Sequence, residues 1–270
     1  MKKLSARRRH PLAALVVLLF ALAATGGLYA AFAPAGSAQA DTSSQSLAIE
    51  QGKKLFATGC SSCHGLNGQG SSDGPSLVGV GSAAVDFQVG TGRMPAQQPG
   101  PQVEKKKNIY SQAEIDQMAA YVASLGPGPS IPSKSDYTTT DPQAVSQGGE
   151  LFRTNCAQCH NFAGEGGALS GGKFAPSLKG VSPKHMYEAM LTGPQNMPSF
   201  PDSTMPQKQK QQIIAFVEHT TSTDNPNYGG LSLGRLGPVT EGLFGWIFAL
   251  GALIGVAIWI AARTTKAKKS

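Results

Sequence analysis

Two long apolar stretches flank a polar middle in this chain. Residues 11–33 and 242–262 contain no charged side chain over 23 and 21 positions. A helix needs about 20 apolar residues to cross the hydrocarbon core of a bilayer, and uncharged runs of this length are unusual in soluble domains. We therefore expect a transmembrane helix at each end of the chain, with a buried core helix as the alternative for each.

The polar middle repeats itself along the sequence. At an offset of 96 residues, Gly52–Cys60 aligns with Gly148–Cys156 and matches it at five of nine positions. Later features recur in the same order, and internal repetition of this kind sets the number of domains. We predict two tandem domains, at 46–126 and 144–222. The Pro- and Gly-rich segment 127–143 between them is typical of a linker.

Each repeat begins and ends with apolar residues at helical spacing. Ser111 followed by Glu114 has the form of a capping box, which predicts where the closing helix of the first repeat begins. Between these helices we expect glycine-rich loop with few strands. Two short helices cannot bury enough apolar area to order so much loop, so each domain should enclose a cofactor. The predicted fold class is mainly α, with two tandem domains of this kind between the two transmembrane helices.

The basic residues gather at the two ends of the chain. The formal net charge is +7, but residues 1–33 and 242–270 hold nine of the 23 basic side chains and no acidic one. The middle, 34–241, keeps 14 basic residues against all 16 acidic ones, which gives no basis for nucleic-acid binding. Lys and Arg are enriched on the cytoplasmic side of membranes. We therefore expect the basic segments 1–10 and 263–270 in the cytoplasm and the middle on the extracytoplasmic side of the cell membrane.

The first apolar stretch has a second interpretation. Its basic start, apolar centre and the small-residue run Ala35–Ala40 also fit a cleaved secretory signal. Its apolar length exceeds the 7–15 residues that are usual for such a signal, which favours an uncleaved anchor. Both interpretations export the middle of the chain.

Both repeats contain the motif Cys-x-x-Cys-His, and together the two motifs account for every cysteine in the chain: Cys60-Ser-Ser-Cys63-His64 and Cys156-Ala-Gln-Cys159-His160. The motif is the attachment signature of c-type haem, in which two thiols on one helical turn bind the haem and the next residue ligates the iron. A Cys-x-x-Cys alone also fits a redox pair, and two pairs fit a zinc site. A zinc site would combine both pairs in one domain, whereas here each pair has its own repeat and its own histidine.

The haem iron needs a sixth ligand, and methionine serves in cytochromes c. Met94 and Met197 each precede a proline and occupy corresponding places in the two repeats. Met205, which also precedes a proline, is the rival of Met197. His185 and His219 could ligate iron as well, but neither has a counterpart in the first repeat, so we interpret them as surface or hydrogen-bonded polar residues.

Pro75 and Pro176 follow the haem histidines of the two repeats, each two positions before a leucine. A proline carbonyl at this place could accept the imidazole N–H and so fix the tautomer and orientation of the ring. The alternative is that each proline only turns the loop.

These residues together resemble a known family. With two Cys-x-x-Cys-His motifs, two Met-Pro candidates and a terminal apolar helix with a basic tail, residues 46–262 resemble the dihaem cytochrome c subunit of the actinobacterial cytochrome bcc complex. The resemblance implies a mainly α fold with two tandem cytochrome c-like haem domains and two covalently bound haem c groups. The residues it assigns to them are Cys60, Cys63, Cys156 and Cys159 for attachment, His64 and His160 as proximal ligands, and Met94 and Met197 as distal ligands.

The same resemblance implies a place in the respiratory chain. Electrons would pass from the Rieske iron–sulfur subunit of a quinol-oxidising complex, which also contains a cytochrome b subunit, through both haems to a terminal cytochrome oxidase. The chain would then be the electron-transfer subunit of a quinol:cytochrome c reductase, with no bond chemistry of its own. The alternatives are a free-standing membrane-anchored dihaem carrier and a dihaem peroxidase. A peroxidase needs an open sixth position on one haem, whereas each repeat offers a methionine there.

Overall fold

The computed structural model describes residues 11–32, 38–98, 100, 102–222 and 238–267. The expected basic segment at 1–10 and the last three residues of the basic tail lie outside the described residues. The chain divides into two compact units after Ala48, and each unit is described by itself.

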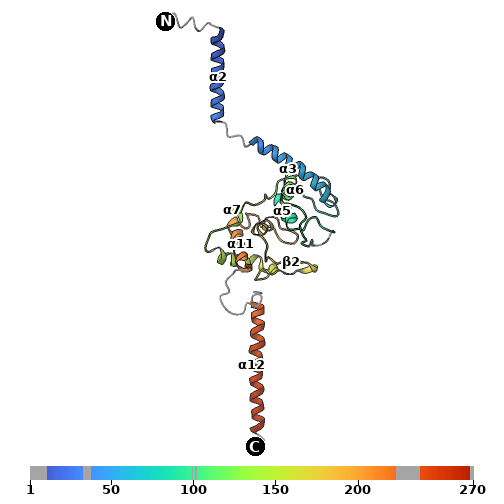
Figure 1. The fold of residues 1–270 in the computed structure, drawn as a ribbon. Helices are drawn as coiled ribbons and strands as arrows, with labels where there is room; N and C mark the ends of the chain where they lie inside the picture. The colour runs from blue at the N-terminus through green and yellow to red at the C-terminus, as the bar shows by residue number, and fades with distance from the viewer. Residues whose placement is uncertain (1–10, 33–37, 99, 101, 223–237, 268–270) are drawn as a thin grey trace. The chain divides into compact units, whose positions relative to one another are not determined.

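Both apolar stretches are helices (Figure 1). Helix α2 covers Pro11–Phe32 and helix α12 covers Pro238–Ala267. Their segments Leu12–Tyr29 and Gly242–Arg263 have mean hydropathies of 2.2 and 2.3, and neither is buried within the protein. The chain therefore has an apolar helix near each terminus that is long enough to cross a membrane, as predicted.

The first repeat is built from four helices: α3 (Ala38–Gly59), α4 (Ser61–His64), α5 (Gly81–Gly90) and α6 (Gln112–Ser124). The capping box that the sequence predicts is present at the start of α6. The Ser111 hydroxyl accepts a hydrogen bond from the Glu114 amide, while the Glu114 carboxylate accepts one from the Ser111 amide at 2.8 Å. This reciprocal pair satisfies two backbone donors that would otherwise have no partner in the first turn.

The linker and the second repeat contain five helices and a short sheet: α7 (Lys134–Tyr137), α8 (Ala144–Asn155), α9 (Ala157–His160), β1 (Gly167–Ala168), the 3₁₀ turn η1 (Ser170–Gly172), β2 (Phe174–Ala175), α10 (Pro183–Thr192) and α11 (Gln207–Thr221). The two strands pair in antiparallel fashion around η1. The fold is mainly helical with few strands, as predicted, and it contains two domains of the same design.

In each domain the opening helix crosses the closing helix at a glycine. A Cβ atom on Gly52 would overlap the carbonyl oxygen of Gln117 in α6, and a Cβ on Gly148 would overlap the carbonyl oxygen of Gln212 in α11. Only glycine allows two helix backbones to approach this closely. Because Gly52 and Gly148 are aligned in the sequence repeat, the two domains share one helix-crossing geometry.

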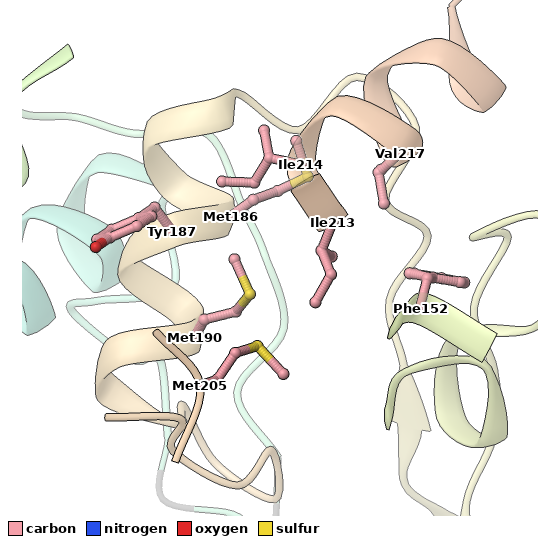
Figure 2. Packing of buried hydrophobic residues seen from close by; sticks show 8 residues of the cluster. All are labelled: Phe152, Met186, Tyr187, Met190, Met205, Ile213, Ile214 and Val217. Atoms are coloured by element: carbon pink, nitrogen blue, oxygen red, sulfur yellow. The ribbon is translucent and has the colours of Figure 1, made fainter. Parts of the chain in front are cut away.

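Each domain also has an aromatic pair between its opening and closing helices. The ring centroids of Phe56 and Tyr121 lie 5.1 Å apart in the first domain, and those of Phe152 and Phe216 lie 5.3 Å apart in the second. Tilted pairs at these distances add to the free energy gained by burying the rings. In the second domain Phe152 belongs to a cluster of eight buried side chains: Phe152, Met186, Tyr187, Met190, Met205, Ile213, Ile214 and Val217 (Figure 2).

One expectation is wrong: the middle of each domain is not only loop. Helix α5 lies between α4 and α6, and α10 lies between β2 and α11. The sequence carried signals for α10, because Ser182 caps its N-terminus, Pro183 occupies its first turn and Gly193 adopts a left-handed conformation after its last residue. Helix α5 has no side-chain cap and is only ten residues long, so packing against α6 and α10 stabilises it.

Candidate functional site

The cysteines and histidine of each motif lie on one short helical turn. In the first domain Cys60 immediately precedes α4, which contains Cys63 and His64. The amides of Cys63 and His64 donate to the Cys60 carbonyl at 3.3 and 3.0 Å. The second motif repeats this turn around the Cys156 carbonyl, with distances of 3.1 and 2.9 Å. The four cysteines form no disulfide with one another.

A proline carbonyl orients the imidazole in each domain. His64 Nδ1 lies 2.7 Å from the Pro75 carbonyl oxygen, and His160 Nδ1 lies 3.0 Å from the Pro176 carbonyl oxygen. A carbonyl can only accept, so Nδ1 carries the proton in both rings and Nε2 keeps a free lone pair. Burial lowers the pKa of His160 more than the hydrogen bond to Pro176 raises it, which favours the neutral ring. The expected carbonyl partner of each histidine is confirmed, and neutral imidazole with a free Nε2 is a good metal ligand.

The loop after each motif is held by matched backbone hydrogen bonds. The His64 carbonyl accepts from the Gly70 amide at 2.7 Å, and the His160 carbonyl accepts from the Gly166 amide at 2.9 Å. Gly74 shows how closely this loop approaches the ring, since a Cβ there would lie 3.1 Å from His64 Nδ1. These contacts bring the proline carbonyl to the imidazole in both domains.

Apolar side chains surround the thiols that precede each turn. Cys60 packs against the buried cluster of Phe56, Tyr121 and Val122 in the first domain, and Cys156 packs against the buried cluster of the second domain. Burial, and to a smaller degree the second thiol of each motif, raises the pKa of Cys60 and of Cys156 to about 11. Both thiols therefore lie in apolar surroundings, which suit contact with an apolar macrocycle.

Within the described part of the chain, the cysteines and the motif histidines form no cluster of three or more metal-ligating side chains. This geometry disfavours a zinc site shared by the two motifs. The donor set in each domain consists of two thiols on one turn, an oriented imidazole and an apolar surround. It fits a c-type haem, whose macrocycle needs apolar contacts and whose iron needs the imidazole Nε2.

Met94 and Met197 occupy corresponding places after the middle helix of each domain. Met94 follows α5, and its amide donates to the Gln88 carbonyl at 2.9 Å. Its side chain is partly buried and packs against the cluster of Val89, Ile115 and Met118. Met197 follows α10 in the same way and packs, partly buried, at the edge of the second cluster.

The rival methionine and the two other histidines lie elsewhere. Met205 is only 3% exposed and lies inside the second cluster next to Met190 (Figure 2). His185 lies in the first turn of α10, with its Nε2 3.8 Å from Asp86 Oδ2. His219 lies on an exposed position of α11. Met205 therefore has the surroundings of a core residue, and His185 has those of a polar interface residue.

Comparison with known proteins agrees with this geometry. Residues 49–126 match the family model described as cytochrome c, and residues 143–217 match the model described as cytochrome c oxidase, cbb3-type, subunit III. A more distant relative, the cbb3-type cytochrome c oxidase subunit FixP of Azorhizobium caulinodans, is 32% identical over 47% of this chain and 43% of its own length. Among solved structures, a chain of a reducing HAO-like protein complex from Kuenenia stuttgartiensis covers 64% of this chain at 15% identity, with 96% of its own length covered and a TM-score of 0.36; this likeness is too distant to support an argument.

Other relatives match over nearly the whole chain. The cytochrome bc1 complex cytochrome c subunit of Corynebacterium efficiens is 46% identical over 97% of this chain and 94% of its own length. The subunit of the same name from Mycobacterium bovis is 46% identical over 96% of this chain and 93% of its own length. Identity at this level over nearly the whole chain identifies an electron carrier of one family. The chain belongs to the family of cytochrome c subunits of the cytochrome bc1 complex.

Proposed function

We propose that the chain binds two haem c groups, one in each domain, and passes electrons between them. The observation that carries this proposal is the duplicated turn, in which each Cys-x-x-Cys-His motif has its own imidazole oriented by its own proline carbonyl. We take the domains to be residues 46–126 and 144–222, joined by 127–143. In each domain the two thiols would form thioethers to one haem.

Each iron would have one histidine and one methionine as axial ligands. His64 and His160 would supply Nε2, and Met94 and Met197 would supply the thioether sulfur. When bound, the haem supplies a one-electron iron centre, whose potential a methionine ligand raises. The proline carbonyls fix the histidine tautomer, and the apolar side chains near each motif would contact the macrocycle. With both axial positions of each iron occupied, electron transfer would be favoured over bond chemistry.

We further propose the route of the electrons. They would enter from the Rieske iron–sulfur subunit of the same quinol-oxidising complex, beside the cytochrome b subunit, and leave to a terminal cytochrome oxidase. Membership of the cytochrome bc1 complex family supports the first half of this route. The match of residues 143–217 to a cytochrome oxidase subunit model supports an oxidase as acceptor. The haem domains would face the extracytoplasmic side, between membrane helices α2 and α12.

A free-standing carrier and a dihaem peroxidase are the competing functions. Carbon monoxide tests the peroxidase, because it binds a reduced haem whose sixth position is open. We expect neither haem of the reduced protein to take it up. Purification in mild detergent tests the free-standing carrier, since cytochrome b and the Rieske protein should co-purify with the chain. Carbon monoxide uptake by one haem, or purification of the chain alone, would favour the respective alternative.

The first prediction concerns covalent attachment. Thioether bonds survive unfolding, so both haems should stay with the denatured chain on a gel stained for haem. The double substitution Cys60→Ala with Cys63→Ala should leave about half of the stain, because the second motif is intact. The matched control replaces the two residues inside the motif, Ser61→Ala with Ser62→Ala, and should keep all of it. Loss of all colour from the wild-type band on boiling in detergent would contradict the covalent attachment.

A further inference from the structure

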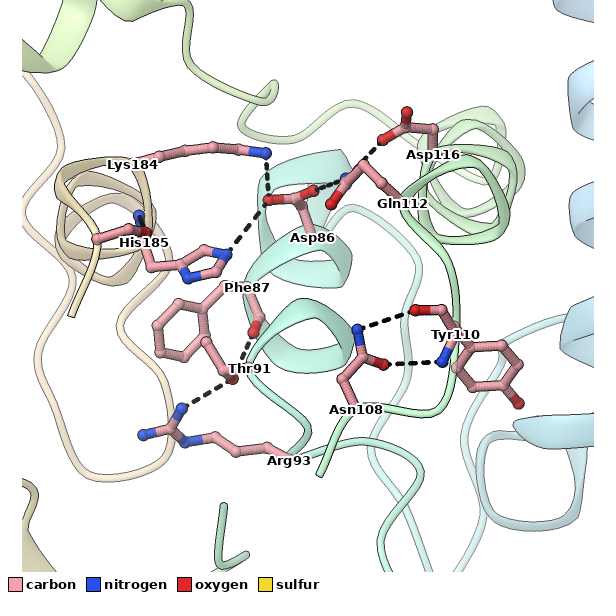
Figure 3. Close-up of polar contacts among 11 residues, drawn as sticks. Asp86, Phe87, Thr91, Arg93, Asn108, Tyr110, Gln112, Asp116, Lys184 and His185 are labelled. Carbon is pink, nitrogen blue, oxygen red and sulfur yellow. Dashed lines mark hydrogen bonds and ion pairs between the residues drawn. The ribbon is translucent and has the colours of Figure 1, made fainter. Parts of the chain in front are cut away.

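The two haem domains contact each other through α5 of the first and α10 of the second. Lys184 Nζ in α10 lies 2.7 Å from Asp86 Oδ2 in α5 (Figure 3). The ring of His185 stands edge-on to the ring of Phe87, with centroids 6.1 Å apart. This contact places charged and aromatic groups of both domains in one buried interface.

Uncharged hydrogen bonds accompany this contact. The side-chain amide of Gln102 donates to the Phe174 carbonyl at 2.7 Å and accepts from the Phe174 amide at 2.8 Å. The Gln195 side chain donates to the Val103 carbonyl at 3.0 Å. None of these groups changes its charge between pH 4 and 10, so titration of the interface depends on the residues around Asp86.

Asp86 and Glu188 form a carboxyl pair that is closed off from water. The two residues are 1% and 0% exposed. Their carboxylate oxygens and the His185 ring lie within 4.8 Å of one another, and neither Glu188 oxygen receives a hydrogen bond from a protein donor. Two carboxylates this close cannot both be ionised away from water. Lys184 compensates only one negative charge, so the second must be neutralised by something else.

A proton on Glu188 satisfies this requirement. Protonated Glu188 becomes a donor, and the ionised Asp86 carboxylate beside it is the acceptor. Burial, followed by the hydrogen bond to Asp86 and the charge of that residue, raises the pKa of Glu188 to about 9. Burial also acts to raise the pKa of Asp86, but hydrogen bonds from Lys184, Glu188 and Gln112 hold that pKa below its usual range. The pair therefore contains one proton and one negative charge at neutral pH.

A divalent cation is the competing occupant of this cluster. It would have to displace Lys184, whose ammonium group already faces Asp86 Oδ2. With the lysine in place, the ion pair and one proton balance every charge in the cluster. The observed contacts therefore favour a proton on Glu188 over a bound divalent cation.

We propose that Glu188 is a positioning residue, whose protonated carboxyl holds α10 of the second haem domain against Asp86 of the first. The proposal rests on the proposed function, because the spacing of the domains matters only if electrons cross between two haems. The rate of electron tunnelling falls steeply with distance, so an interface that opens slows the crossing. Glu188 would act through this spacing and not by contact with either haem.

The other charged groups around the pair leave a clear pH window for a test. Asp86 stays ionised above pH 4, and its hydrogen bond and charge raise the pKa of Lys184 above 10.5 despite burial. Burial lowers the pKa of His185 below 6.5, and Lys184, Lys105 and Arg93 add to this effect against the attraction of Asp86. The negative charge of Asp116 in α6 also contributes to raising the pKa of Lys184. Between pH 7 and 9, Glu188 is therefore the one group of this cluster whose protonation differs between the closed and open interface.

Linkage sets the sign of the effect. Glu188 binds its proton more tightly in the closed interface than in the open one, where water restores a pKa near 4.5. Closure is therefore favoured at low pH. The equilibrium constant for opening of the interface rises about tenfold per pH unit as the pH approaches 9. Above pH 9 both states are ionised and the rise stops. Glu188→Gln keeps a neutral hydrogen-bond donor but cannot lose a proton. The variant should therefore show no dependence of the opening constant on pH in this range.

The experiment measures amide hydrogen exchange in α5 and α10 of the full-length, haem-loaded protein in detergent. From pH 7 to pH 9 the wild type should lose about fiftyfold in protection relative to Glu188→Gln measured at the same pH, because Glu188 is already half ionised in the closed interface at pH 9. Glu150→Gln, at an exposed position of α8, is the matched control and should behave as the wild type. Equal slopes in the wild type and in Glu188→Gln would overturn the proposal.

Two further measurements separate the possible failures. Glu188→Ala should slow electron transfer between the haems after pulsed photoreduction, whereas Glu188→Gln should restore the rate; equal rates in all three proteins would overturn the positioning role. The purified protein should contain no tightly bound divalent metal at this cluster. If it did, and if removing the metal with a chelator abolished the exchange protection, the assignment of a proton to Glu188 would be wrong. If the chain bound only one haem, the proposed function would be wrong. The dependence of hydrogen-exchange protection on pH would still show whether Glu188 is protonated in the closed interface.

Discussion

At the scale of single residues, local spacing predicts which side chains would hold each haem. Two cysteines and a histidine within five positions lie close together on any backbone, and here they lie on one helical turn. The carbonyl partners of the histidines were one of two interpretations of Pro75 and Pro176, and the structure confirms them. The contact of Asp86 with Glu188 could not be predicted, because it joins two domains and neither residue belongs to a motif.

The second prediction concerns the sixth ligand of the second haem. We expect Met197→Ala to open this haem to carbon monoxide and to lower its reduction potential, because the variant loses the thioether ligand. Met205→Ala should change neither property. Since Met205 is buried in the cluster of Figure 2, its truncation should instead cost about 2–5 kcal/mol of stability. Carbon monoxide difference spectra and a redox titration of each variant make the comparison.

Met190→Ala is the matched control for this comparison. Met190 is buried in the same cluster as Met205 and has no counterpart among the Met-Pro candidates. It should lose stability without binding carbon monoxide. Carbon monoxide uptake by Met205→Ala, with none by Met197→Ala, would show that the alignment of the repeats assigns the wrong methionine.

At the scale of helices, the sequence predicted elements that carry a cap or a strong apolar period. The closing helix α6 begins at the capping box around Ser111, as expected. Helices α5 and α10 were missed for different reasons. Helix α10 carries cap signals in its own sequence, whereas α5 depends on burial of residues such as Ala83 and Phe87 against other elements. A short helix of that second kind is stabilised by tertiary packing, which local patterns do not reveal.

The third prediction tests the glycine crossings. Gly148→Ala adds a Cβ that overlaps the Gln212 carbonyl, so α8 and α11 must move apart. We expect a loss of about 1–3 kcal/mol of stability, as for overpacked cores, and the same for Gly52→Ala in the first domain. Thermal unfolding followed by the helical circular dichroism signal measures the change. Ser146→Ala, at an exposed position of α8, is the control and should leave the midpoint nearly unchanged.

An unchanged midpoint for both glycine variants would mean that the helices adjust without cost. Different results for the two variants would show that the domains, although alike in geometry, differ in how easily the opening and closing helices move apart. The carbonyl of Gln117 would then have more freedom to move than that of Gln212, or the reverse.

At the scale of the whole molecule, the number of domains followed from the sequence and their contact did not. The repeat at an offset of 96 residues predicted two domains before any element was assigned. The interface between α5 and α10 depends on helices that the repeat did not mark. Its charged residues, Asp86 and Lys184, are types that are common on surfaces, yet Asp86 is buried and Lys184 is partly buried at this contact.

The last prediction concerns the orientation of the chain in the membrane. The excess of basic residues at 1–10 and 263–270 predicts both ends in the cytoplasm and the haem domains outside. Protease added to sealed, outside-out membranes should therefore remove the haem domains and spare a tag placed after Ser270. The same treatment should also spare a tag at Met1 if the first apolar helix is an uncleaved anchor, whereas a cleaved signal would leave the mature protein without that tag from the start. Digestion of the tag at Ser270 would contradict the topology, because α12 ends in basic residues that should hold its terminus on the cytoplasmic side.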